Sequence, residues 1–116
     1  MTVEASLFGV LGPLVTSRAY PDLAPIGTVR PYVTYQQVGG QSVNFLDSAV
    51  PNKGNSRFQV NVWADTRAAA ALLAGQVEQA LRTAAALQTT VMGQPVATYD
   101  LDTLLFGTRQ DFSFFV

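Results

Sequence analysis

The chain has 116 residues, a formal net charge of −1 and an isoelectric point of about 5.0. It contains no cysteine and no histidine, which excludes disulfides, thiolate metal sites and a Ser-His-Asp triad. The seven basic residues are scattered, so we expect no sequence-specific nucleic-acid partner. Only 13% of residues are charged, against about 25% in an ordinary domain. A surface with so few charges indicates protein partners. The alternative is that the many alanines raise the hydrophobic share to 48% without forming apolar patches.

The length fits one domain spanning residues 1–116. We expect no membrane span, because no run of about 18 apolar residues occurs. The first residues, Met1 to Glu4, have no basic region of the kind that precedes an export signal. The expected location is therefore the cytoplasm of the producing cell.

A short helix is predicted from Thr2 to Leu11, with Thr2 as its cap. Gly12-Pro13 is predicted to stop this helix, because proline cannot continue it. A short extended piece should follow from Val15 to Tyr20, and then a connection held by several prolines.

Residues Tyr32–Val38 alternate as a strand does, and Gly39-Gly40 is typical of a hairpin turn. We therefore expect a returning strand from Ser42 to Leu46. The polar segment Asp47–Ser56 is predicted to be a long exposed loop. It is either a plain connector or a projecting arm that becomes ordered on a partner.

The most informative stretch is Arg57–Leu87, which changes from a strand period to a helix period. Phe58, Val60 and Val62 share one strand face, and a helical stripe follows after the possible caps Asp65-Thr66. Neither face can be buried alone, so the helix should lie across the strand.

Two further strands are predicted at Val96–Leu101 and Thr108–Val116, linked through an apolar Leu104-Leu105-Phe106. In the second of them Phe115 points away from Phe112 and Phe114, so it needs either a second helix or a neighbouring subunit to cover it. The expected class is α+β, with an antiparallel-rich sheet of about five strands in the order α-β-β-β-α-β-β and one long and one short helix packed on it.

No group of residues predicts catalysis, a cofactor or a metal. Asp100 and Asp102 share a strand face near Asp111, but no base or further ligand accompanies them, so a solvated face is the better interpretation. The glycines do not have the spacing of a phosphate loop. We therefore expect a protein that is not an enzyme.

The candidate functional residues are interface residues. Trp63 lies on the strand face opposite the helix, and Trp and Arg often dominate protein–protein contacts. Partial burial of Trp63 under the first helix or a loop is an equal alternative. The full set of interface candidates is Arg57, Asn61, Trp63, Phe115, Asn52, Lys53 and Asn55.

Four stretches in order carry a family resemblance: YPDLAP at Tyr20–Pro25, PYVTYQQVGG at Pro31–Gly40, RFQVNVWADTRAAAALLAGQVEQAL at Arg57–Leu81 and DFSFFV at Asp111–Val116. Together they resemble the tail completion proteins, also called tail-to-head joining or tail terminator proteins, of long-tailed phages and prophages. The strand ending in Val-Trp-Ala before the helix is the most specific part.

This resemblance implies an α+β structural virion protein that is often monomeric alone and forms an oligomeric ring, expected to be a hexamer, at the head-proximal end of the tail. Its implied partners are further copies of itself, the tail tube protein and the head connector proteins. The alternative is a small α+β ligand-binding or regulatory domain that dimerises through a sheet edge.

Overall fold

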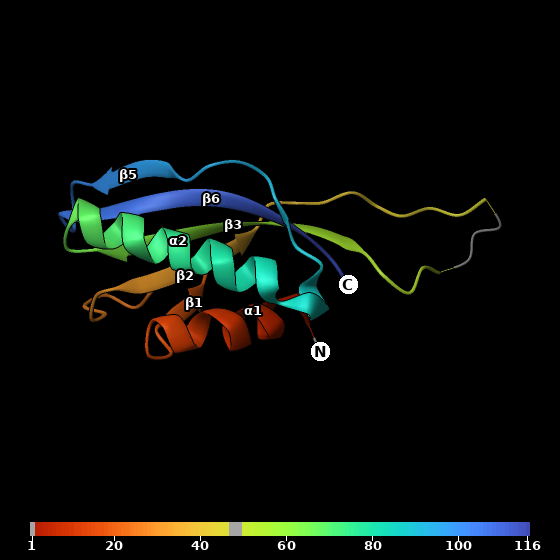
Figure 1. The fold of residues 1–116 in the computed structure, drawn as a ribbon, viewed down its shortest axis with the longest axis horizontal. Helices are drawn as coiled ribbons and strands as arrows, with labels where there is room; N and C mark the ends of the chain where they lie inside the picture. The colour runs from red at the N-terminus through yellow and green to blue at the C-terminus, as the bar shows by residue number, and fades with distance from the viewer. Residues whose placement is uncertain (1, 47–49) are drawn as a thin grey trace.

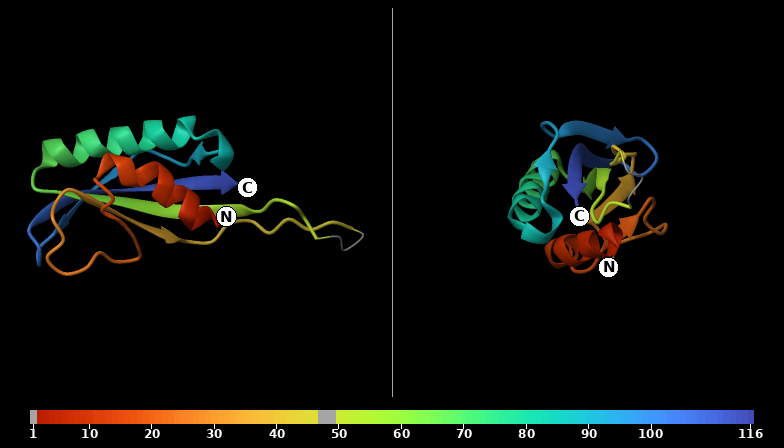
Figure 2. Two further views of the ribbon diagram at one scale, coloured as in Figure 1. Left: turned by 90° about the horizontal axis from the view of Figure 1, so that it is seen from below. Right: turned by 90° about the vertical axis from the view of Figure 1, so that its right-hand side faces the viewer.

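The computed structural model describes residues 2–46 and 50–116. This part of the chain forms one sheet with its two α-helices on the same face (Figures 1 and 2). The predicted α+β class is confirmed, with six strands in place of about five. The elements are α1 (Val3–Leu11), η1 (Gly12–Leu14), β1 (Ala19–Pro21), β2 (Tyr32–Gln37), β3 (Asn55–Ala64), α2 (Arg67–Thr83), η2 (Ala85–Leu87), β4 (Thr90–Val91), β5 (Val96–Asp100) and β6 (Leu105–Phe115).

The sheet is built around β6, which pairs with β3 on one side and with both β4 and β5 on the other. From β3 the order continues to β2 and then to β1 at the edge. Only the β1–β2 pair is parallel; the other pairs are antiparallel. Ten register pairs join β3 to β6, from Asn55↔Phe115 to Ala64↔Phe106. This ladder is the longest in the sheet, and its two strands run along the long axis of the molecule (Figure 1).

The hydrophobic core lies between this sheet and the two helices. Alternate residues of β3, including Phe58, Val60 and Val62, are buried in the same cluster as Leu73 and Val77 of α2. The predicted layer between the helix stripe and the preceding strand is therefore confirmed. Each fully buried side chain of this size contributes roughly 1.5–3 kcal/mol relative to exposure.

Helix α2 begins where the sequence predicts. The Oγ1 atom of Thr66 accepts a hydrogen bond from the backbone N–H of Ala69 at 3.1 Å, which satisfies a free donor of the first turn. The helix ends at Thr83, so the prediction of a helix up to Leu87 is wrong. Ala84 has φ −78° and ψ 89°, outside the helical region. The chain turns there, and Leu87 reaches the core from the separate turn η2.

The first helix is capped by Thr2, as predicted, whose Oγ1 accepts from the N–H of Ala5 at 3.1 Å. The α-helix ends at Leu11, as predicted, although Gly12 keeps a helical φ of −52° and the chain continues into the short 3-10 turn η1. Proline is compatible with a first helical turn, where its missing N–H would be unpaired anyway. The extended piece predicted from Val15 is shorter, since β1 begins only at Ala19.

The predicted hairpin at Gly39-Gly40 with a returning strand at Ser42–Leu46 is wrong: β2 pairs directly with β3. The glycines continue beside β3 instead of turning, because Gly39 accepts from the N–H of Arg57 at 2.9 Å. A Cβ on Gly40 would lie 2.3 Å from the backbone oxygen of Asn55, so only glycine fits there.

We call residues 38–46 and 50–54 the arm, which extends from the sheet along its long direction (Figure 1). The molecule measures 52 × 25 × 23 Å along its principal axes. Within the predicted loop Asp47–Ser56, residues 50–54 lie outside strands, Asn55 and Ser56 belong to β3, and 47–49 lie outside the described residues.

The two C-terminal strands are confirmed, and the largest shift of boundary is at the start of the second one. Strand β6 begins at Leu105, so Leu105 and Phe106 belong to the strand and not to the predicted connection. Leu105 is buried, while Leu104 takes a left-handed φ of 58° in the turn before it. The two-residue strand β4 is an addition that the sequence pattern does not predict.

Candidate interface

The side of the sheet that faces away from the helices carries the predicted interface residues of β3. We call this side the open face. The register places Arg57, Asn61 and Trp63 on it, beside Ser113, Arg109 and Gly107 of β6. None of these residues belongs to the core cluster. The predicted grouping of Arg57, Asn61 and Trp63 on one free strand face is therefore what the structure shows.

Two of the candidates are bonded within the subunit. The guanidinium of Arg57 donates to Oδ2 of Asp111 from Nε at 3.0 Å and from Nη2 at 2.6 Å. Asn55 donates from Nδ2 to Oγ of Ser113 at 2.6 Å, and its Oδ1 accepts from the N–H of Gln41 at 2.8 Å. Asn55 thus fastens the base of the arm to β6, which is a structural role.

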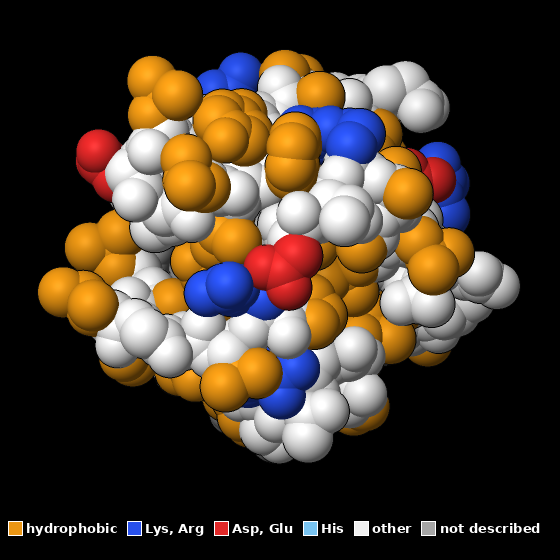
Figure 3. Space-filling view, turned by 90° about the vertical axis from the view of Figure 1, so that its left-hand side faces the viewer, with side chains coloured by type: hydrophobic (Ala, Val, Ile, Leu, Met, Phe, Trp, Pro, Cys, Tyr) orange, Lys and Arg blue, Asp and Glu red, His pale blue; other side chains and the backbone are white. Residues whose placement is uncertain are grey.

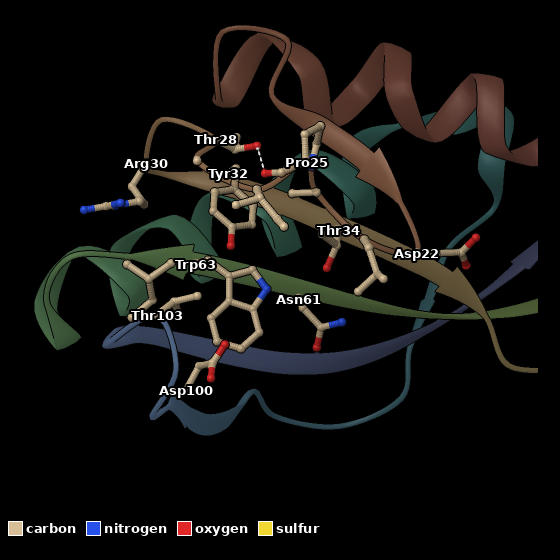
Figure 4. Close-up of a pocket in the computed structure, with 15 residues that line it drawn as sticks. Asp22, Pro25, Thr28, Arg30, Tyr32, Thr34, Asn61, Trp63, Asp100 and Thr103 are labelled. Atoms are coloured by element: carbon tan, nitrogen blue, oxygen red, sulfur yellow. Dashed lines mark hydrogen bonds between the residues drawn. The ribbon is translucent and has the colours of Figure 1, made fainter.

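Trp63 lies at the opposite end of the open face, in a pocket of about 400 Å³ (Figure 4). Tyr32 is its register partner on β2, and its ring lies beside the indole. Asp100 of β5 lies below the indole in the same view. The loop of residues 22–30 forms the rim. Trp63 is half-buried and lines this pocket together with the loop, whereas α1 packs on the other face of the sheet and does not cover it.

The Trp63 pocket is acidic. Asp22 and Asp100 line it together with Arg30, but the Nε atom of Arg30 forms an ion pair with Asp65 at 2.9 Å. Burial raises the pKa of the Tyr32 hydroxyl, and the nearby Asp100 carboxylate raises it further, while Arg30 opposes this. Tyr32 is therefore a neutral hydroxyl near neutral pH. Aromatic rings beside carboxylates form a surface that attracts cations.

Exposed apolar side chains surround this pocket. We call the pocket and these neighbours the loop end. Figure 3 views this end of the molecule and shows hydrophobic side chains gathered between a few charged ones. The largest exposed hydrophobic residues here are Leu23, Ile26, Val29, Leu101 and Leu104. Exposed apolar side chains that gather at one place favour an interaction site.

The second exposed apolar surface is at the base of the arm. Phe115 is 40% exposed and points away from the core, as the strand alternation predicts. The Nζ atom of Lys53 lies 5.6 Å from the centroid of the Phe115 ring. A shallow hollow of about 330 Å³ is lined by Val43, Phe45, Val50, Pro51, Asn52, Lys53 and Phe115. We call this the arm patch, and it brings together Asn52, Lys53 and Phe115 of the candidate residues.

Sequence reasoning missed part of this arrangement. Tyr32, Asp100 and the 22–30 loop were not interface candidates, although they complete the Trp63 pocket. The missing information is the pairing of β2 with β3 and of β5 with β6, which local patterns do not contain. Asp102 lies in the turn after β5, where its N–H donates to Oδ1 of Asp100 at 3.0 Å. The predicted shared strand face of these two aspartates is therefore wrong.

Within residues 2–46 and 50–116, no three acidic, His or Cys side chains gather where they could hold a metal ion. Nor does any helix in this part of the chain have the length and apolar content to cross a membrane. The fold and the two surfaces define a small, elongated α+β protein with exposed apolar side chains at each end.

Residues 4–116 match the family described as Tail completion protein gp17, and the chain belongs to this family. The predicted resemblance to phage tail completion proteins is thereby confirmed. Among solved structures, the chain is similar to one in "Virion of native gene transfer agent (GTA) particle", with 14% identity and a TM-score of 0.46. That similarity covers 98% of this chain and 93% of the other. No curated protein sequence matches significantly.

Proposed function

We propose that this protein completes the phage tail by forming a ring that caps the tail tube and joins the tail to the head connector. The family match over residues 4–116 is the observation that carries this proposal. In this role the chain acts as one structural domain and not as an enzyme. Assembly takes place in the host cytoplasm, and the finished ring lies at the head-proximal end of the tail.

A closed ring needs two different patches on each subunit, one meeting the other on the next copy. The arm patch and the open face with Trp63 meet this requirement, because they are separate surfaces at opposite ends of β3. The assembled ring contains six copies of the chain. Its other partners are the tail tube protein and the head connector. In this proposal the chain is a monomer when it is free in solution, and it forms the ring only when it binds to the tail tube.

The test combines two variants with imaging of tail tubes. Trp63→Ala removes the aromatic floor of the pocket, and a deletion within Asn52–Asn55 shortens the arm. We expect both to abolish ring formation on tubes and tail-to-head joining. Glu4→Gln, an exposed change on α1, is the control and should assemble normally. Normal rings and normal joining with both variants would refute the assignment of these residues.

The second candidate is a small ligand-binding domain that dimerises through a sheet edge. It is favoured by the Trp63 pocket, whose volume of about 400 Å³ is in the range of small-molecule sites. Strand β5 offers a free edge, since its only strand partner in the described chain is β6. Mass measurement separates the two functions: a fixed dimer carrying a small molecule supports this one, and rings on tubes support the first.

A further inference from the structure

The two exposed surfaces are complementary in charge as well as in position. The loop end presents Asp22 and Asp100 among apolar side chains, and its one lining cation is already paired with Asp65. The arm patch presents Lys53 among apolar side chains, and in the described chain Lys53 makes no ion pair. Among the lining residues, the loop end therefore has two carboxylates against one paired guanidinium, and the arm patch has one ammonium group.

Their positions exclude a contact within one subunit. Asn55 and Trp63 mark the two ends of the exposed side of β3, eight residues apart, which separates them by about 27 Å at the usual rise of a strand. The arm extends beyond Asn55, away from the Trp63 pocket (Figure 1). A contact between the two surfaces can form only between different copies of the chain.

The Trp63 pocket also suits the chemistry of Lys53. Tyr32 and Trp63 provide two aromatic faces, and Asp100 provides a carboxylate beside them. An ammonium group is stabilised both by an aromatic ring within about 6 Å and by an opposite charge. Within its own subunit Lys53 already lies over one aromatic ring, that of Phe115. Transfer to the pocket would keep an aromatic contact and add a carboxylate.

We infer that the arm patch of one copy docks on the loop end of the next copy, with Lys53 facing the carboxylate of Asp100. The inference rests on the proposed function, because it names the two surfaces that meet in the ring. The contact is heterologous, because it joins two different surfaces. Each subunit uses its arm patch to bind one neighbour and its loop end to bind the other. Apolar side chains around the central charge pair, Phe45 and Val50 against Leu23 and Ile26, exclude water from it.

The first experiment uses the absence of cysteine in the chain. One copy carries Asn52→Cys and a second copy carries Thr103→Cys, and the two are mixed with polymerised tail tube protein under oxidising conditions. We expect a disulfide-linked heterodimer, because Asn52 lines the arm patch and Thr103 lines the Trp63 pocket. The control pair is Arg82→Cys, exposed on α2, with Thr103→Cys, which should not link.

The second experiment exchanges the charges. Lys53→Glu alone and Asp100→Lys alone should each weaken association of the copies by about tenfold or more, and the doubly exchanged chain should recover it. Arg82→Glu on α2 changes the net charge as Lys53→Glu does, and it should leave association of the copies unchanged. Circular dichroism checks that Asp100→Lys is folded, and Asp100→Asn is the milder second variant.

The outcomes separate the two proposals. Cross-linking together with recovery in the exchanged chain supports the arm-to-loop-end contact. Rings that form without either effect overturn this contact and leave the proposed ring function intact. Cross-linking of Asn52→Cys to the tube protein instead assigns the arm to that partner and overturns the inference. If copies associate neither alone nor on tubes, both proposals fail.

Discussion

Gln110 of β6 and Glu78 of α2 are joined by a hydrogen bond of 2.8 Å between the sheet and the long helix. The same amide nitrogen of Gln110 donates to the carbonyl of Gly93 at 2.8 Å, in the connection before β5. Gln110 is 4% exposed, whereas the Glu78 side chain is 26% exposed and Gly93 is exposed, so both bonds lie at the boundary between core and solvent. This one side chain therefore ties three separate segments together at the edge of the core.

Replacing Gln110 with Leu should destabilise the fold. The change removes two hydrogen bonds that each contribute roughly 0.5–1.5 kcal/mol, so the free energy of unfolding should fall by about 1–3 kcal/mol. Urea unfolding followed by the fluorescence of Trp63, the only tryptophan, measures the loss. Gln79→Leu on the exposed side of α2 is the matched control. Equal stability of the two variants would contradict a structural role for Gln110.

Stability should depend on the charge of Glu78 in acid. The hydrogen bond from Gln110 lowers the pKa of the Glu78 carboxyl, and a second bond from Arg82 at 3.1 Å lowers it further. Because the pKa is lower in the folded state, the carboxylate contributes stability above the ordinary carboxyl range. This contribution disappears as the pH falls through the folded pKa.

We therefore expect Glu78→Gln to lose less stability than the parent chain when the pH falls from about 5 to 3. Thermal unfolding at several pH values measures the difference. Glu4→Gln, which removes a carboxyl group from α1 outside this network, is the control and should follow the parent chain. Parallel pH profiles for all three proteins would show that Glu78 is not linked to folding.

Gly107 should be intolerant of any side chain. A Cβ at this position would lie 2.6 Å from the carbonyl oxygen of Val62 and 2.7 Å from the Trp63 ring. Gly107→Ala must therefore displace the indole or the strand, at a cost of about 1–3 kcal/mol. A shift of the Trp63 emission maximum reports the displacement. Gly75→Ala, where a Cβ meets nothing within 4 Å, should leave the emission unchanged.

The cap of α2 should contribute measurably to stability. Thr66→Ala removes the acceptor for the Ala69 N–H and should cost about 1 kcal/mol, whereas Thr66→Ser keeps a hydroxyl acceptor and should cost much less. Chemical unfolding of both variants measures this difference. If alanine and serine were equally tolerated, another group would have to satisfy the first turn.

Features that depend on neighbouring residues were predictable. The change of period between β3 and α2, the Thr2 and Thr66 caps and the outward direction of Phe115 all follow from spacing along the chain. Each involves interactions over a few residues or a simple alternation of faces. These features are enough to predict the fold class.

Features that depend on pairing between distant segments were not predictable. Gly39-Gly40 has the composition of a turn, yet hydrogen bonds with Arg57 and contact with Asn55 keep the glycines beside β3. The Trp63 pocket likewise needs β2, β5 and the 22–30 loop to meet at one end of the sheet. A single sequence contains local propensities, but it does not say which strands pair. The candidate residues therefore include three that line the arm patch, whereas Tyr32, Asp100 and the 22–30 loop of the pocket were missed.

The ladder between β3 and β6 has a consequence for how fast the molecule folds. Its register partners lie between 42 and 60 positions apart along the chain, from Ala64↔Phe106 to Asn55↔Phe115. Closing such large loops is slow, and sheets dominated by distant pairings fold in roughly milliseconds to seconds. Until that closure, Phe112 and Phe114 are exposed to solvent. Newly made chains are therefore vulnerable to aggregation during this interval, and chaperones would increase the yield of assembly-ready subunits.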